Sequence, residues 1–149
     1  MIRPVRTSPL HADFKLLVTQ LDKDLAVSDG DEHEFYNQFN GLENIAHAVL
    51  LYKEDSPVAI GALKPYNEHT MEIKRMYTSA NHRRQQLASK VLGELEQWAH
   101  ELGFARCILE TGKRQPAAIA LYKSCGYTVI ANYGQYREKE NSVCFEKRL

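Results

Sequence analysis

The chain has few of the residues that mark disulfide-rich, metal-dependent or membrane proteins. Three of its 149 residues are cysteines, at widely separated positions, so a disulfide framework is not expected. The sequence contains no Cys-x-x-Cys or His-Glu-x-x-His, and its six histidines show no ligand spacing, so we expect no metal site. No apolar run approaches the roughly 20 residues that span a bilayer. The first residues also lack the apolar stretch of a secretory signal, which predicts a cytoplasmic protein without a membrane partner.

The sequence also lacks an excess of charge of either sign. Nineteen basic and nineteen acidic residues give a formal net charge of zero. Binding of nucleic acid over a broad surface needs clustered excess Lys and Arg, so no nucleic-acid partner is expected. A dinucleotide-binding fold is excluded as well, because no Gly-x-Gly-x-x-Gly occurs. The hydrophobic fraction of 44% and the length fit one globular domain over residues 1–149.

Hydrophobic periodicity predicts a mixed α/β fold with about six or seven strands and about four helices. Pro4 favours an edge position for the first strand. Expected strands cover residues 2–6, 46–52, 58–63, 71–78, 105–111, 127–131 and 143–147. Expected helices cover residues 10–27, 31–39, 87–102 and 116–125. Hairpin-like spacing predicts antiparallel pairing in the first half, and strand–helix–strand alternation predicts parallel pairing in the second.

A basic turn joins an expected strand to a long amphipathic helix. The strand is residues 72–78, the turn contains Arg83 and Arg84, and the helix begins near Leu87. Free N–H groups and the positive end of the helix dipole make such a helix start a site for anions. The alternative is a solvated basic loop without a ligand.

The second informative segment follows the next expected strand, which ends in Leu109-Glu110-Thr111. It continues through Pro116 to the run Ala-Ile-Ala-Leu-Tyr-Lys-x-x-Gly-Tyr at residues 118–127. This run resembles the second acetyl-CoA motif of the GNAT superfamily of N-acetyltransferases. The basic turn resembles the pyrophosphate-loop motif of the same superfamily, Arg/Gln-x-x-Gly-x-Gly/Ala. The two motifs stand in the family's order, one helix and one strand apart, and residues 132–136 resemble a subgroup of small, single-domain bacterial members.

The resemblance implies the GNAT acyl-CoA N-acyltransferase fold and a function in transferring an acetyl group. Acetyl-CoA would be the co-substrate, and the acceptor would be the primary amine of a small molecule, amino acid or peptide. The backbone at the end of the strand would pair with the pantetheine arm, and the turn would hold the pyrophosphate. The implied cofactor-binding residues are Met76, Tyr77, Thr78, Arg83, Arg84, Gln85, Gln86, Leu87, Ala88, Ser89, Gln115, Ala118 and Tyr122.

Three residues are candidates for proton transfer. By resemblance, Tyr122 is the general acid, and Glu110 or Glu72 is the general base. The chemistry suits these residue types, because a carboxylate can accept the proton of the attacking amine and a phenol can supply one to the leaving thiolate. Without the motif, Tyr122 would be a core aromatic, Glu110 a strand-end carboxylate paired to Lys113 or Arg114, and Glu72 an exposed strand residue.

One departure from the family pattern concerns the turn. Gln86 stands where the family has its central glycine, and Arg84 stands where a further glycine is common. We expect Gln86 to adopt the backbone conformation of a first helical turn, with its side chain directed away from the cofactor. An acetyl-CoA-binding module with weak or no catalysis is therefore the alternative function.

The acceptor pocket is expected from residues 26–36 and from the loop 132–142. The first of these segments is acidic, which would attract a cationic amine or polyamine, although acidic residues also complement a helix start. A homodimer through the closing strands is compatible with the sequence.

Overall fold

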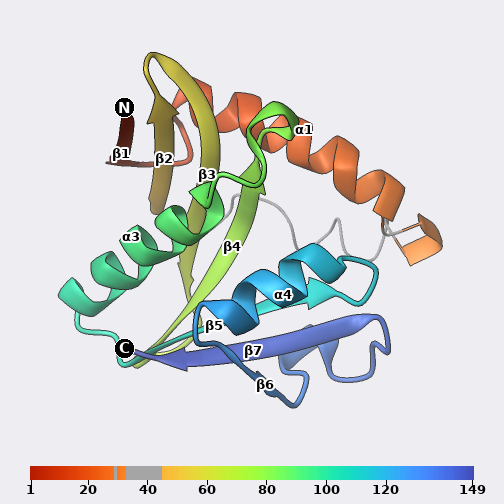
Figure 1. Ribbon diagram of the computed structural model, residues 1–149. Helices are drawn as coiled ribbons and strands as arrows, with labels where there is room; N and C mark the ends of the chain where they lie inside the picture. The colour runs from red at the N-terminus through yellow and green to blue at the C-terminus, as the bar shows by residue number, and fades with distance from the viewer. Residues whose placement is uncertain (29, 33–44) are drawn as a thin grey trace.

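The computed structural model of the protein describes residues 1–28, 30–32 and 45–149 and contains a seven-stranded mixed sheet (Figure 1). The strands are β1 Ile2–Thr7, β2 His47–Lys53, β3 Ser56–Pro65, β4 Thr70–Thr78, β5 Arg106–Gly112, β6 Thr128–Ile130 and β7 Ser142–Arg148. The α-helices among the described residues are α1 Ala12–Ser28, α3 Leu87–Glu101 and α4 Pro116–Ser124. Three short 3-10 helices are η1 Gly30–Glu32, η2 Ala80–His82 and η3 Gly134–Tyr136.

The described part of the chain thus has three α-helices, where about four were predicted. Most of the helix predicted over residues 31–39 lies outside the described residues. No helix in the described ranges is both long and apolar enough to cross a membrane.

The strands lie in the order β1-β2-β3-β4-β5-β7-β6. Antiparallel pairing of the first four strands confirms the prediction for the first half. In the second half only β4 and β5 pair in parallel, so the prediction of parallel pairing there was partly wrong. The reason is that β7 pairs antiparallel with both neighbours and separates β6 from β5.

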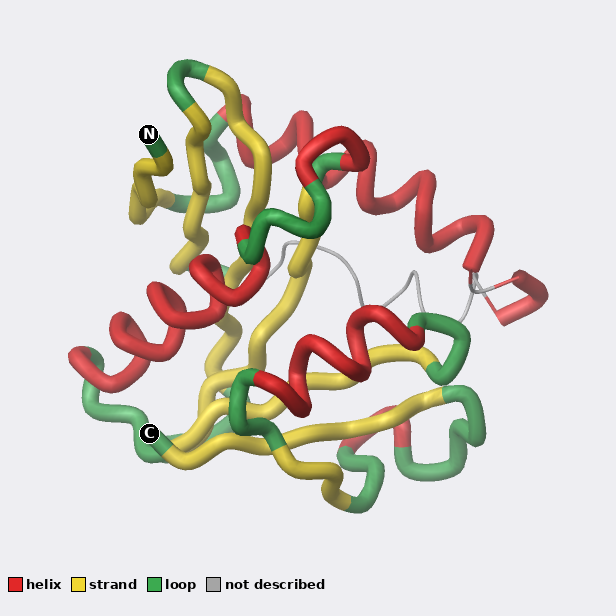
Figure 2. Tube along the Cα trace, in the orientation of Figure 1, coloured by secondary structure: helices red, strands yellow, loops and turns green. Residues whose placement is uncertain are grey.

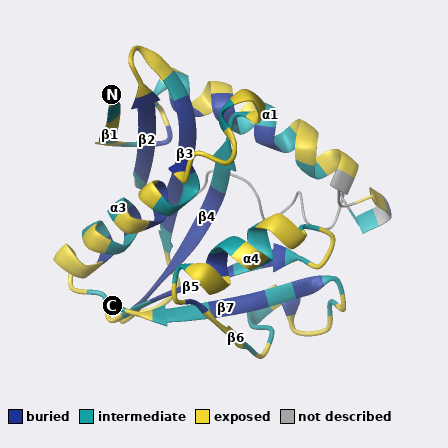
Figure 3. Cartoon of the chain, viewed as in Figure 1, coloured by how far each residue is buried: buried dark blue, intermediate teal, exposed yellow. Residues whose placement is uncertain are grey.

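Helices cover both faces of the sheet. On one face α3 packs with the stripe that its spacing predicts, and Tyr122 of α4 joins the same core. On the other face α1 contributes Phe14 and Leu17, which pack against Leu50 and Ile60. The central strands β2 and β3 are therefore buried along most of their length (Figure 3).

Gly61 of β3 allows α3 to approach the sheet closely. A Cβ atom at this position would lie 2.7 Å from side-chain atoms of Leu95, Val91 and Met76. That separation is shorter than any ordinary contact between such atoms, so close packing of α3 on β3 requires a residue without a side chain. The same contact places the sulfur of Met76, from β4, inside the packing of α3 on the sheet.

The sheet opens between β4 and β5. Their parallel pairing covers only Thr70–Glu72 of β4, after which the two strands diverge (Figure 2). A register shift in the pairing of β3 with β4 bends β4 beyond this point, and Arg75 adopts a positive φ of 59° at the bend. Bulges re-aim the side chains of a strand and end its pairing. The divergence creates a gap in the middle of the sheet.

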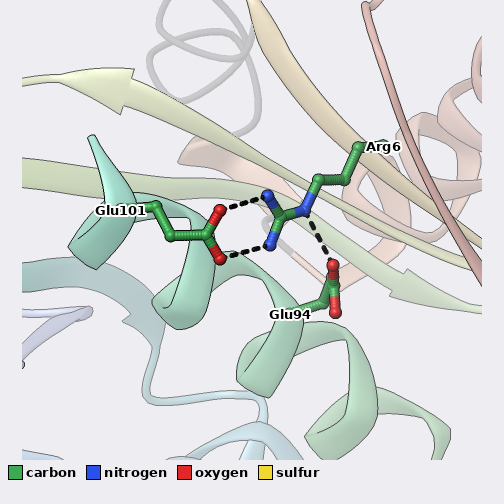
Figure 4. A network of polar contacts seen from close by, with 3 residues as sticks. All are labelled: Arg6, Glu94 and Glu101. Carbon is green, nitrogen blue, oxygen red and sulfur yellow. Dashed lines mark hydrogen bonds and ion pairs between the residues drawn. The ribbon is translucent and has the colours of Figure 1, made fainter.

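A cluster of charged side chains ties β1 to α3 far from this gap (Figure 4). Two nitrogens of Arg6 donate to the carboxylate of Glu101 at 2.8 and 3.0 Å, and its Nε donates to Glu94 at 2.8 Å. The guanidinium also lies over the ring of Trp98, 5.1 Å from the centroid. The hydrogen bonds with Arg6 are the main cause that lowers the pKa of Glu101 to about 2.

Candidate functional site

A groove of about 850 Å³ runs along the end of β4, the beginning of α3 and the adjoining face of α4. The predicted cofactor-binding residues line it, with one exception. The exception is Gln85, whose side-chain oxygen accepts a hydrogen bond of 3.2 Å from Lys53 outside the groove. The predicted residues along the groove are Met76, Tyr77, Thr78, Arg83, Arg84, Gln86, Leu87, Ala88, Ser89, Gln115, Ala118 and Tyr122.

The basic turn adopts a backbone that glycine would favour. Arg84 has a φ of 65°, and Gln86 has φ 61° and ψ 24°, in the left-handed region. The expectation of a first-turn helical conformation at Gln86 was therefore wrong. Side chains at such positions cost roughly 1–2 kcal/mol each. The turn has a glycine-type geometry even though Arg84 and Gln86 carry side chains.

The turn directs the start of α3 into the groove. Gln86 is the N-cap residue but makes no side-chain capping hydrogen bond, and its carbonyl accepts the hydrogen bond of Lys90. The amides of Leu87, Ala88 and Ser89 therefore have no partner within the helix. Such amides, at the positive end of a helix of 15 residues, can bind a phosphate group.

Arg83 and Arg84 differ in how they are held. Arg83 donates to the carbonyl of Thr78 and to Asp24 of α1 at 2.9 Å, so it connects α1 to the turn. Arg84 is exposed and lines the groove. Of the two, Arg84 is thus better placed to contact an anion there.

A smaller cavity of about 130 Å³ occupies the gap between β4 and β5. It shares several lining residues with the groove, so the two spaces meet there. The shared residues are Leu21, Leu25, Met76, Gln115, Ala118 and Tyr122.

Tyr122 is buried where the groove and the cavity meet. Its ring packs 5.9 Å from the rings of both Tyr127 and Phe145. Burial raises the pKa of the Tyr122 phenol, and the negative charge of Glu110 raises it further. The phenol therefore remains protonated at neutral pH.

Glu72 lines the cavity as a buried carboxylate, with 6% of its surface exposed. The alternative of an exposed strand residue was therefore wrong. Its Oε2 accepts a hydrogen bond of 2.7 Å from Tyr133 and lies 3.9 Å from Nζ of Lys74. Burial lowers the pKa of Lys74, while Glu72 opposes that shift. Burial and Glu72 together raise the pKa of Tyr133.

Glu110 faces the same cavity from β5. It is half-buried, and its Oε2 accepts a hydrogen bond of 2.8 Å from Ser142. Burial is the largest cause that raises the pKa of Tyr136, as it is for Tyr122, and the charge of Glu110 raises both pKa values further. The charge of Glu110 thus acts on two tyrosines that line the cavity.

Arg75 completes the charged lining of the cavity. Its side chain is 2% exposed and pairs through Nη2 with Asp22 of α1. Two further nitrogens, Nε and Nη1, are buried and make no hydrogen bond with any described residue. The cavity is therefore lined by two carboxylates and two cations. Among the described residues no group of three or more side chains could hold a metal ion.

Some of these residues were not singled out by sequence reasoning. Lys74 and Arg75 stand inside the first motif segment, but nothing local distinguishes a cation that faces a cavity from one that faces solvent. The 132–142 loop, predicted to build the acceptor pocket, does bring Tyr136 to the cavity. Of the other predicted segment, residues 29 and 33–36 lie outside the described part.

The structure and the sequence each match known proteins. Residues 15–127 match the model of the acetyltransferase (GNAT) family. An uncharacterised N-acetyltransferase of Bacillus subtilis, YsnE, is 37% identical over 116 residues, 73% of this chain and 76% of its own length. An IAA acetyltransferase of Azospirillum brasilense is 29% identical and covers 97% of this chain and 95% of its own.

A crystal structure from Klebsiella pneumoniae, of a protein assigned to the acyl-CoA N-acyltransferases, superposes with a TM-score of 0.83. That protein is 31% identical, over 100% of this chain and 98% of its own. The PaiA N-acetyltransferase of Thermoplasma acidophilum, solved with coenzyme A, is 14% identical and shares the fold, with a TM-score of 0.74 over 100% of this chain and 99% of its own. This chain belongs to the GNAT family of acetyltransferases and is an acyltransferase.

Proposed function

We propose that the enzyme transfers the acetyl group of acetyl-CoA directly to the primary amine of a small molecule, amino acid or peptide. The observation that carries the proposal is the junction at Tyr122, where a long groove meets a charged cavity between the diverging strands. This arrangement supports a thioester held at the junction, with the amine approaching from the cavity.

The groove suits coenzyme A at both ends. The uncapped amides at the start of α3 and the exposed Arg84 would hold the diphosphate. Met76 borders both the groove and the cavity, which supports the predicted role of its backbone beside the pantetheine arm and the thioester carbonyl. Acetyl-CoA supplies the activated acetyl group, and the protein supplies position and proton acceptors.

We propose Glu110 rather than Glu72 as the base. Oε2 of Glu72 is already engaged within the protein, because it accepts a hydrogen bond from Tyr133 and adjoins Nζ of Lys74. After burial, the charge of Glu110 is the next largest cause that raises the pKa of Tyr122, and the charge of Glu72 does not contribute to that shift. Glu110 is therefore the better placed to accept a proton near the thioester, directly or through one water.

In this proposal the acetyl group moves directly to the amine, without a covalent enzyme intermediate. The nitrogen of the neutral amine bonds to the carbonyl carbon, its proton passes to Glu110, and the carbon–sulfur bond breaks. The sulfur leaves as a thiolate, whose pKa is near 8.5 by analogy with cysteine. Because Tyr122 stays protonated, its hydroxyl can donate to that sulfur and support its departure.

Two measurements test the proposal. Calorimetric titration with acetyl-CoA should show binding, and a panel of amines should release free thiol with at least one acceptor. Binding without thiol release across the panel would support the alternative of a cofactor-binding module. Absence of binding would reject both functions.

A further inference from the structure

Arg75 is a buried cation of the cavity whose N–H donors are only partly paired. A guanidinium carries five N–H donors, and Asp22 engages it through Nη2. Nε and Nη1 are buried without a partner among the described residues. Buried donors without acceptors are unfavourable, and more so on a charged group, so an acceptor supplied from elsewhere would stabilise this arrangement.

The backbone also holds Arg75 in an unfavourable conformation. Its φ of 59° lies in the left-handed region, at the bend where β4 leaves β5. A strained residue next to a cavity is more readily explained by a role in binding than by stability. The bend places Arg75 and Lys74, consecutive residues of one strand, in the lining of the same cavity.

Lys74 is the second buried cation in the lining of the cavity. Its recorded ion pair with Glu72 is 3.9 Å long, beyond hydrogen-bond distance, although the residue is only 8% exposed. The two cations thus adjoin the two carboxylates Glu72 and Glu110 in one small space. Such a set of charges complements a ligand that carries a positive and a negative group close together.

We infer that the acceptor is an amino acid or a similar small amino carboxylate, whose carboxylate binds Arg75 and Lys74 while its amine faces Glu110. Hydrogen bonds between a guanidinium and a carboxylate are charge-assisted and strong, and either of the unpartnered nitrogens can donate one. The volume of about 130 Å³ is small beside the roughly 300–1,000 Å³ of sites for drug-sized ligands, which favours a small acceptor over a peptide. The inference rests on the proposed acetyl transfer and names its substrate class.

The test compares matched acceptors that differ only in the carboxylate. Free L-amino acids with small, apolar, polar and aromatic side chains are paired with their primary amides, and spermidine represents polyamines. For each, kcat/KM is measured with acetyl-CoA for the wild type, Arg75→Met and Arg75→Lys. Arg6→Met is the matched control, because it removes an arginine outside the cavity.

The wild type should prefer the acids. Arg75→Met should reduce the ratio of acid to amide turnover about 10- to 100-fold, mainly through KM, as expected for the loss of a charged hydrogen bond. Arg75→Lys should retain part of the preference, and Arg6→Met should retain all of it. Arg75→Met should also melt no lower than the wild type, whereas the loss of a purely structural arginine would lower the melting temperature.

Three results would overturn the inference. Amides or spermidine turned over as well as the acids would leave acetyl transfer intact and reject the carboxylate. An unchanged preference in Arg75→Met would reject Arg75 as its partner. If no acceptor is turned over, the proposed function fails. Calorimetry of the coenzyme A complex with the same acids then tests the inference by itself. If the acids do not bind, or bind equally well to wild type and Arg75→Met, the inference is rejected too.

Discussion

Two arginines of this protein illustrate how pairing separates a structural group from a functional one. Arg6 lies near the surface, and two carboxylates of α3 accept hydrogen bonds from three of its nitrogens (Figure 4). Arg75 is buried, strained and only partly paired. The first arrangement engages three nitrogens within the protein, whereas the second leaves two nitrogens for the ligand that we propose.

The largest expected effect concerns Glu110. In Glu110→Gln, kcat should fall about 10²- to 10⁴-fold, because the amine loses its proton acceptor while the shape of the cavity is kept. Steady-state thiol release measures the change. Glu94→Gln is the matched control in the Arg6 cluster and should keep its rate while melting lower. If Glu110→Gln and Glu94→Gln released thiol at equal rates, the cavity carboxylate would be no more important for catalysis than the surface one, and Glu110 would be rejected as the base.

The next effect concerns Tyr122. Tyr122→Phe should lower kcat about 10- to 100-fold, because the thiolate leaves without a hydrogen-bond donor. Tyr127→Phe is a suitable control. The Tyr127 hydroxyl donates a hydrogen bond of 2.8 Å to Glu96, and neither residue lines the groove or the cavity. The substitution should reduce stability and leave the rate unchanged. If Tyr127→Phe slowed the reaction as much as Tyr122→Phe, packing rather than proton donation would explain both.

The Arg6 cluster should show its contribution in stability and pH dependence. Arg6→Met should lower the melting temperature by about 3 °C at pH 7, without change in acceptor preference. Because Arg6 lowers the pKa of Glu101 to about 2, the pair stabilises the fold above the ordinary carboxyl pKa and is lost as Glu101 is protonated. The difference between wild type and variant should therefore be constant from pH 7 to about pH 5.5 and shrink progressively toward pH 2.

Thermal melts of both proteins across this pH range provide the measurement. A difference that stayed constant down to pH 2 would show that the lost packing on Trp98, rather than the ion pairs, stabilises the cluster.

The smallest effect concerns the turn before α3. Gln86→Gly should stabilise the protein by at most about 1 kcal/mol, since relief of the left-handed strain is partly offset by the greater freedom of glycine in the unfolded chain. Acetyl-CoA affinity should be unchanged or higher, because backbone amides rather than the side chain would hold the phosphates. Gln86→Ala keeps the strain and should show no gain in urea denaturation. Weaker cofactor binding in both variants would instead assign a contact to the Gln86 side chain.

Much of this architecture follows from local patterns in the sequence. The stripe of α3 and the strands that precede and follow it are fixed by side-chain periodicity, and Gly103 ends the helix with a φ of 92°, as predicted. The insertion of β7 between β5 and β6 was missed, because pairing partners far apart in sequence leave no local signal. The left-handed turn at Gln86 was missed for a related reason, since a glycine-type conformation was occupied by a residue that rarely adopts it.

The candidate site divides in the same way. The family resemblance pointed to Tyr122 and Glu110, which line the cavity, and to most residues that line the groove. Arg75 escaped notice because its importance depends on burial and on missing partners, and both are consequences of the bend in β4. Residue type and spacing indicate which groups can do chemistry, whereas the tertiary structure determines which of them lack a partner.

The close packing at Gly61 links the hydrophobic core to the reaction. A methyl group there would force side-chain atoms of Leu95, Val91 and Met76 to move, and Met76 also lines the cavity and the groove. The packing of the core and the shape of the proposed site therefore both depend on the separation between α3 and the sheet. A larger residue at position 61 would therefore change how the proposed acceptor is positioned, although residue 61 itself lines neither the cavity nor the groove.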